Sequence, residues 1–175
     1  MGLLLMMSRK MHLISCRNNL QMELMRKQQE LYDYQTYSSA IGEGVMSTSN
    51  LMSMPNSVFG RSLAYINTAG QYAQLNAQEK FNMMLANGAL NTIYATNPNA
   101  NQQQMQQYVF YNLYQQSLEE FKKQEMALLN KKEKEIQMSI TRLETRLKMV
   151  ESELESVGSQ LGEEAKNAAP KFGLG

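Results

Sequence analysis

The stretch that decides the fold is IQMSITRLETRLKMVESELESVGSQL, residues 136–161, in which apolar residues return every three or four positions. This spacing places them on one side of an α-helix. The same heptad register extends back to residue 126 and gives ten apolar positions, interrupted only by Glu133: Met126, Leu129, Ile136, Ile140, Leu143, Leu147, Val150, Leu154, Val157 and Leu161. These ten residues form the predicted interaction seam. Sustained heptads predict a coiled-coil region over residues 126–161.

A single very long helix over residues 100–167 is predicted around this region, because residues 100–156 contain no glycine or proline. A helix of that length normally lies against another helix. The partner is left open by the sequence: an earlier part of this chain, a second copy or a different protein. Residues 168–175, which include Pro170, are expected to form a flexible tail.

The front of the chain, residues 1–41, is predicted to form an amphipathic helix, since it is rich in Leu, Met, Gln, Glu, Arg and Lys. Two neighbouring apolar stripes follow helical spacing. The first contains the N-terminal apolar face Leu13, Leu20, Leu24 and Leu31, together with Met6 and Tyr34. The second contains Met7, Met11, Ile14, Met25 and Tyr32. Two stripes predict two or more helical neighbours for this segment.

The middle, residues 42–99, reads as a charge-poor loop with short helices. Only four charged residues occur between positions 34 and 118. Pro55 followed by Asn56 indicates a turn, and breaks are expected near Gly70 and Gly88. Asn97 or Asn99 is expected to cap the following long helix. The whole chain is therefore predicted to be all-α, with a long first helix, short middle helices and a very long last helix.

Composition excludes several classes of protein. The lone Cys16 rules out an intramolecular disulfide, and a formal charge of +1 gives no general attraction to nucleic acid. Residues 130–135 (NKKEKE) interleave opposite charges, which is typical of a helix surface. No apolar run approaches the ~20 residues of a membrane span, and no signal peptide is evident. The expected location is the cytoplasm, or outside the cell by export without a cleaved signal peptide.

Catalytic chemistry finds no support. His12 and Cys16 lie four residues apart and would share a helix face, as in an activated thiolate or half of a metal site. No further His or Cys completes either arrangement, so a packed thiol beside a helix-face histidine is the favoured interpretation. We expect no catalytic residues, no metal site and no cofactor, and hence no enzyme.

Two stretches, SRKMHLISCRNNLQMELMRKQQEL at residues 8–31 and TRLETRLKMVESELESVGSQLGEEAKNAAPKFGL at residues 141–174, resemble a group of small uncharacterised bacterial coiled-coil proteins. In that group a coiled coil closes on a short tail, which corresponds here to Pro170, Lys171 and Phe172. The resemblance implies a bacterial origin and carries no established activity.

Three functions are compatible with these patterns. The first is a self-associating structural or assembly protein acting through coiled-coil contacts. The second is a monomeric helical adaptor or chaperone-like module, in which the first helix folds back along the last and Met-rich faces bind a partner; its motivation is the 15 methionines. The third is a peripheral protein that lies on a membrane surface through its apolar, basic start. The expected partner is thus a second copy or another helical protein, and no nucleic acid.

Overall fold

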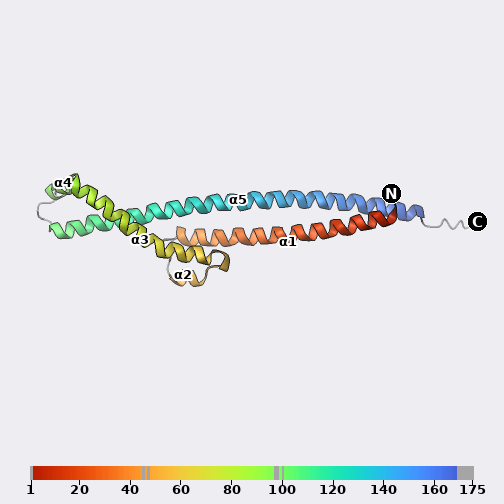
Figure 1. Cartoon of the computed structure of the whole chain (residues 1–175), viewed down its shortest axis with the longest axis horizontal. Helices are drawn as coiled ribbons and strands as arrows, with labels where there is room; N and C mark the ends of the chain where they lie inside the picture. The colour runs from red at the N-terminus through yellow and green to blue at the C-terminus, as the bar shows by residue number, and fades with distance from the viewer. Residues whose placement is uncertain (1, 45, 47, 97–98, 100, 169–175) are drawn as a thin grey trace, which may run out of the picture. The chain divides into compact units, whose positions relative to one another are not determined.

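The computed structural model describes residues 2–44, 46, 48–96, 99 and 101–168. It is all-α over these residues, with the helices α1 (Leu3–Gly42), α2 (Thr48–Met52), α3 (Asn56–Ala86), α4 (Ala89–Thr96) and α5 (Gln102–Ala168) (Figure 1). The predicted all-α class, with a long first helix and a very long last helix, is confirmed. The predicted tail, apart from the helical Ala168, lies outside the described residues.

The chain divides into two compact units, and α1 and α5 each run through both. We call the unit formed by Met1–Tyr32 and Lys134–Gly175 the helix pair, and the unit Asp33–Glu133 the bundle. Each is described by itself below.

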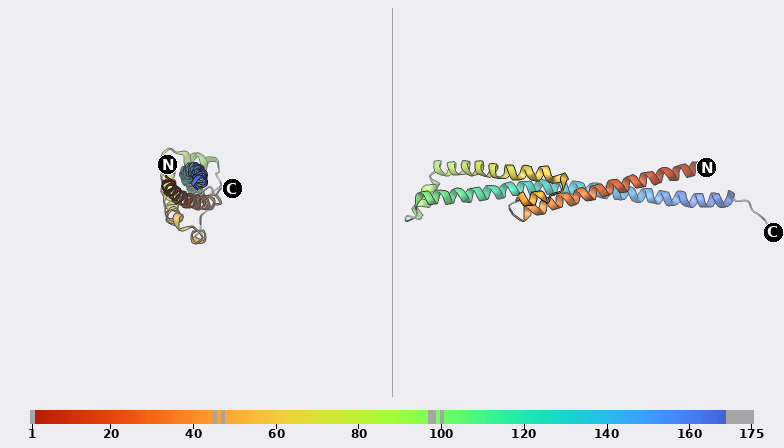
Figure 2. Two further views of the ribbon diagram at one scale, coloured as in Figure 1. Left: turned by 90° about the vertical axis from the view of Figure 1, so that its right-hand side faces the viewer. Right: turned by 90° about the horizontal axis from the view of Figure 1, so that it is seen from below.

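In the helix pair, the front of α1 runs antiparallel beside the back of α5 (Figures 1 and 2). The buried side chains come from both helices at heptad spacing: Met6, Leu13 and Leu20 from α1, and Ile136, Ile140, Leu143 and Val157 from α5. Arg9 and Glu153 form an ion pair across the two helices. The earlier part of this chain therefore covers the α5 seam within the helix pair.

In the bundle, α3 lies along the first part of α5 (Figure 2). Small side chains on α3, namely Ser62, Ala69, Ala73 and Ala77, are buried and allow a close approach of the helices. Two rings of α3 pack against a ring of α5: the ring centroids of Tyr65 and Tyr72 lie 5.5 and 5.0 Å from the centroid of Phe121. A hydrophobic core joins the end of α1 to α3 and α5 and consists of Tyr37, Ile41, Met46, Met54, Val58 and Leu129.

The middle of the chain differs from the sequence prediction. Instead of a loop followed by short helices, α3 is a single 31-residue helix that passes through Gly70 without a break. A glycine inside a helix costs only about 1 kcal/mol relative to alanine, and the buried face of α3 outweighs this cost. The predicted break at Gly88 is confirmed, since Gly88 has φ 70° and separates α3 from α4.

The cap of α5 also differs from the prediction. The backbone amide of Gln103 donates to Asn101 Oδ1 at 2.9 Å, so Asn101 caps this helix. Asn99 lies too early in the chain to do so, and Asn97 lies outside the described residues. Asn101 caps the helix because it lies next to the helix start, where its side-chain oxygen reaches a backbone amide of the first turn.

Candidate interaction surface

The predicted seam on α5 is enclosed to different degrees along its length. Leu129, Ile136, Ile140, Leu143 and Val157 are buried. The other five predicted residues are partly buried: Met126, Leu147, Val150, Leu154 and Leu161. Met126 and Leu129 belong to the bundle, and the remaining eight belong to the helix pair. Most of this apolar surface is therefore covered without a second molecule.

The predicted N-terminal apolar face of α1 also lies in the helix pair. Leu13 and Leu20 are buried in the helix pair, and Leu24 and Leu31 are partly buried. This face contacts α5, which is one of the two or more helical neighbours that the sequence predicts for α1.

The second stripe of α1 differs from the first, because most of its residues are exposed. Met7, Met11, Met25 and Tyr32 are all more than half exposed, and Ile14 is partly buried. Leu4 and Met22 extend the same line and are also exposed. We call these seven residues the Met stripe: Leu4, Met7, Met11, Ile14, Met22, Met25 and Tyr32. At 100° per residue they fit within an arc of about 80° on one side of α1.

The middle of the Met stripe is polar. Asn18 lies on the centre line, is exposed, and accepts a hydrogen bond from Arg17 Nη2 at 3.3 Å. Gln29 occupies the same line near its end. By helix position no charged residue of the helix pair falls within the arc, although the Arg17 guanidinium reaches Asn18 from beside it.

The bundle contains a part-buried polar contact to which three helices contribute. The Glu125 carboxylate on α5 accepts from Tyr37 Oη of α1 at 3.0 Å and from Arg61 Nε of α3 at 2.6 Å. Burial and the neighbouring Glu125 raise the pKa of Tyr37 well above its ordinary value, and the hydrogen bond to Glu125 raises the pKa of Arg61. The Glu125 carboxylate thus links α5 to α1 and α3. Sequence reasoning missed it, although Arg61 is one of only four charges in its region.

The bundle also carries an open hollow of about 570 Å³ between α3 and α5. It is lined by glutamines and aromatic rings: Gln74, Gln78, Phe81, Gln106, Gln107, Phe110, Tyr111 and Tyr114. These groups offer amide hydrogen bonds and ring contacts. No Asp, Glu, His, Cys, Lys or Arg is among these lining residues.

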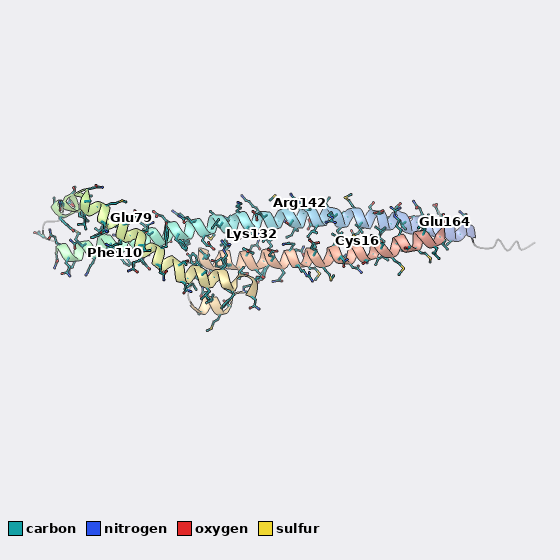
Figure 3. The ribbon with its side chains drawn as sticks, in the orientation of Figure 1. Cys16, Glu79, Phe110, Lys132, Arg142 and Glu164 are labelled. Atoms are coloured by element: carbon teal, nitrogen blue, oxygen red, sulfur yellow. The ribbon has the colours of Figure 1, made fainter. Side chains whose placement is uncertain are left out.

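His12 and Cys16, the two residues considered for a reactive pair, differ in exposure. His12 is exposed and Cys16, labelled on α1 in Figure 3, is partly buried. Over the part of the chain that the structure describes, no group of three or more His, Cys, Asp or Glu is placed to hold a metal ion. Within the same residues, no helix combines the length and apolarity needed to cross a bilayer.

Comparison with known proteins gives no match to a family model, to a curated protein or to a solved structure. The resemblance to bacterial coiled-coil proteins therefore stays a prediction.

Proposed function

We propose that this chain is a non-enzymatic structural or assembly protein that acts through helix–helix association, as a subunit that associates with copies of itself. The observation that carries the proposal is the exposed Met stripe on α1. Its companion stripe on the same helix packs against α5, whereas six of the seven residues of the Met stripe are more than half exposed.

The size of the stripe supports association. The exposed fractions of its six most exposed members correspond to roughly 800 Å² per copy, if a large side chain is taken at roughly 200 Å². Soluble monomers rarely expose a contiguous apolar patch above about 300–600 Å². A standard protein interface takes about 800 Å² from each partner. The stripe thus has the area of one half of an interface.

The sequence alone would place association on the α5 seam. Because α1 of the same chain covers that seam in the helix pair, the proposal places association on the Met stripe instead. Both the cytoplasm and the exterior reached without a cleaved signal peptide are compatible with such a subunit.

A monomeric adaptor is the second candidate, and the fold-back of α1 along α5 favours it. Met side chains adapt to differently shaped partners, which suits a surface that binds other helical proteins. The adaptor would keep the Met stripe open in the isolated protein, whereas the self-associating subunit would cover it.

Light scattering of the full chain at micromolar concentration separates the two candidates. We expect a dimer or larger species that Met25→Glu converts to monomer, because the substitution puts a charge into the stripe. Met149→Glu is the matched control, since Met149 on α5 and Met25 are each 67% exposed. Equal helicity of the variants by circular dichroism excludes unfolding. A monomeric wild-type chain would refute self-association, and liposome flotation lost on deletion of residues 3–14 would favour the membrane-surface alternative.

A further inference from the structure

We infer that the Met stripe binds the Met stripe of a second copy in antiparallel orientation, about a two-fold axis that passes beside Asn18. This inference rests on the proposed function and adds the geometry of the contact. It follows from the spacing, the polar centre and the charge of α1.

The stripe is symmetric about Asn18 in its spacing. Ile14 and Met22 lie four residues before and after it, and Met11 and Met25 lie seven residues away. The ends, Leu4 and Tyr32, lie fourteen residues away. In an antiparallel pair centred on Asn18, each apolar residue therefore faces a large side chain of the second copy. Ile14 faces Met22, Met11 faces Met25, and Leu4 faces Tyr32. An interface related by two-fold symmetry requires this self-complementarity.

The polar residues fit the same arrangement. Asn18 faces Asn18 of the second copy, and an amide side chain offers both a donor and an acceptor for such a pair. A single asparagine in an apolar line fixes the register of two helices, because any shift leaves its amide facing apolar groups. Gln29 faces Met7 near the end of the contact, where its amide reaches water while its methylene groups cover the methionine.

Charge along α1 favours the same orientation. Residues 3–17 carry three basic and no acidic side chains, whereas residues 18–32 carry two of each sign. An antiparallel pair places the basic half of one copy along the mixed half of the other. A parallel pair would place two basic halves side by side and align the two helix dipoles unfavourably.

Disulfide trapping of the full chain tests the geometry. Cys16→Ser serves as the background, because Cys16 lies about 160° around the helix from the centre of the stripe. Chains with Met11→Cys and chains with Met25→Cys, carrying different tags, are oxidised separately and as a mixture. We expect a covalent heterodimer in the mixture and no covalent dimer from either variant alone, since identical positions lie roughly 21 Å apart along the helix axis.

A covalent dimer from Met11→Cys alone would overturn the antiparallel assignment, and so would a mixture that gives no heterodimer. If light scattering still shows a wild-type dimer in either case, self-association stands and only the geometry is wrong. A monomeric wild-type chain refutes both proposals.

A second pair of variants tests the centre of the contact. Asn18→Asp places two carboxylates face to face at the axis and should raise the dimer dissociation constant about tenfold or more at neutral pH. Asn19 is the adjacent exposed asparagine and lies off the stripe, so Asn19→Asp should change the dimer dissociation constant little. Equal effects of the two substitutions would contradict a two-fold axis beside Asn18.

Discussion

Leu143→Ala should destabilise the helix pair strongly, because Leu143 is 6% exposed in the seam between α1 and α5. The substitution removes three buried carbon atoms, each of which contributes about 0.8 kcal/mol. The cavity left behind adds to the cost, although a pair of helices can partly close around it. We therefore expect a loss of about 2.5–3.5 kcal/mol in the free energy of unfolding, in the lower half of the range for leucine-to-alanine changes.

Urea unfolding followed by circular dichroism measures this loss at two protein concentrations that differ by about a hundredfold. Because α1 of the same chain covers Leu143, the difference between variant and wild type should be the same at both concentrations. Met149→Ala, on the outward face of the same helix, serves as the control and should change the free energy of unfolding by less than about 0.5 kcal/mol.

Hydrogen exchange gives the location of the effect. Amide protection should fall together in residues 3–32 and 134–168, since the two segments support each other. A loss below about 1 kcal/mol would refute the burial of Leu143 by α1. A loss that grows on dilution would show that a second copy fills the seam.

Three further predictions concern other parts of the chain. The raised pKa of Tyr37 means that the fold favours the neutral phenol, so the contribution of Tyr37 to stability should be constant below about pH 10 and fall as the pH rises further; alkaline unfolding of Tyr37→Phe should lack this part of the slope. Gly70→Ala should stabilise α3 by about 0.5–1 kcal/mol in urea unfolding, because an added Cβ would lie 3.7 Å from a tyrosine hydroxyl, an ordinary contact; Gly88→Ala should instead cost about 1–2 kcal/mol, because φ is 70° there. Arg9→Ala should change the free energy of unfolding by no more than about 0.5 kcal/mol, since Arg9 and Glu153 are about half exposed and water screens their attraction; a larger loss, insensitive to salt, would contradict this.

The long helices were predictable because their apolar spacing is regular over many turns. The heptads on α5 and the first stripe on α1 indicate which faces are buried, and the structure buries Leu143 and Leu20. Spacing does not name the partner of a face, however. Whether α5 would meet α1, a second copy or another protein depends on where the intervening residues allow the chain to turn, and no local pattern contains that information.

The middle helix was hard to predict because its buried face carries little hydrophobic signal. Ala69, Ala73 and Ala77 are buried, whereas Leu75, which hydrophobicity alone would place inside, is 72% exposed. Close packing of α3 against α5 requires small residues, so the most apolar side chains do not mark the contact. The contact of Arg61 with Glu125 was equally hard to predict from the sequence, since it joins residues 64 positions apart.

The two stripes of α1 differ in chemistry as well as in exposure, and this difference bears on their roles. The buried stripe is mainly leucine, and α5 meets it with isoleucine, leucine and valine, whose limited rotamers specify a single packing arrangement. The Met stripe is built from flexible side chains that specify packing poorly and adapt to a second surface. A contact formed once during folding gains from a fixed geometry, whereas a contact between separate molecules must form and release. The distribution of leucine and methionine on α1 therefore supports a permanent internal pair on one side and a reversible association on the other.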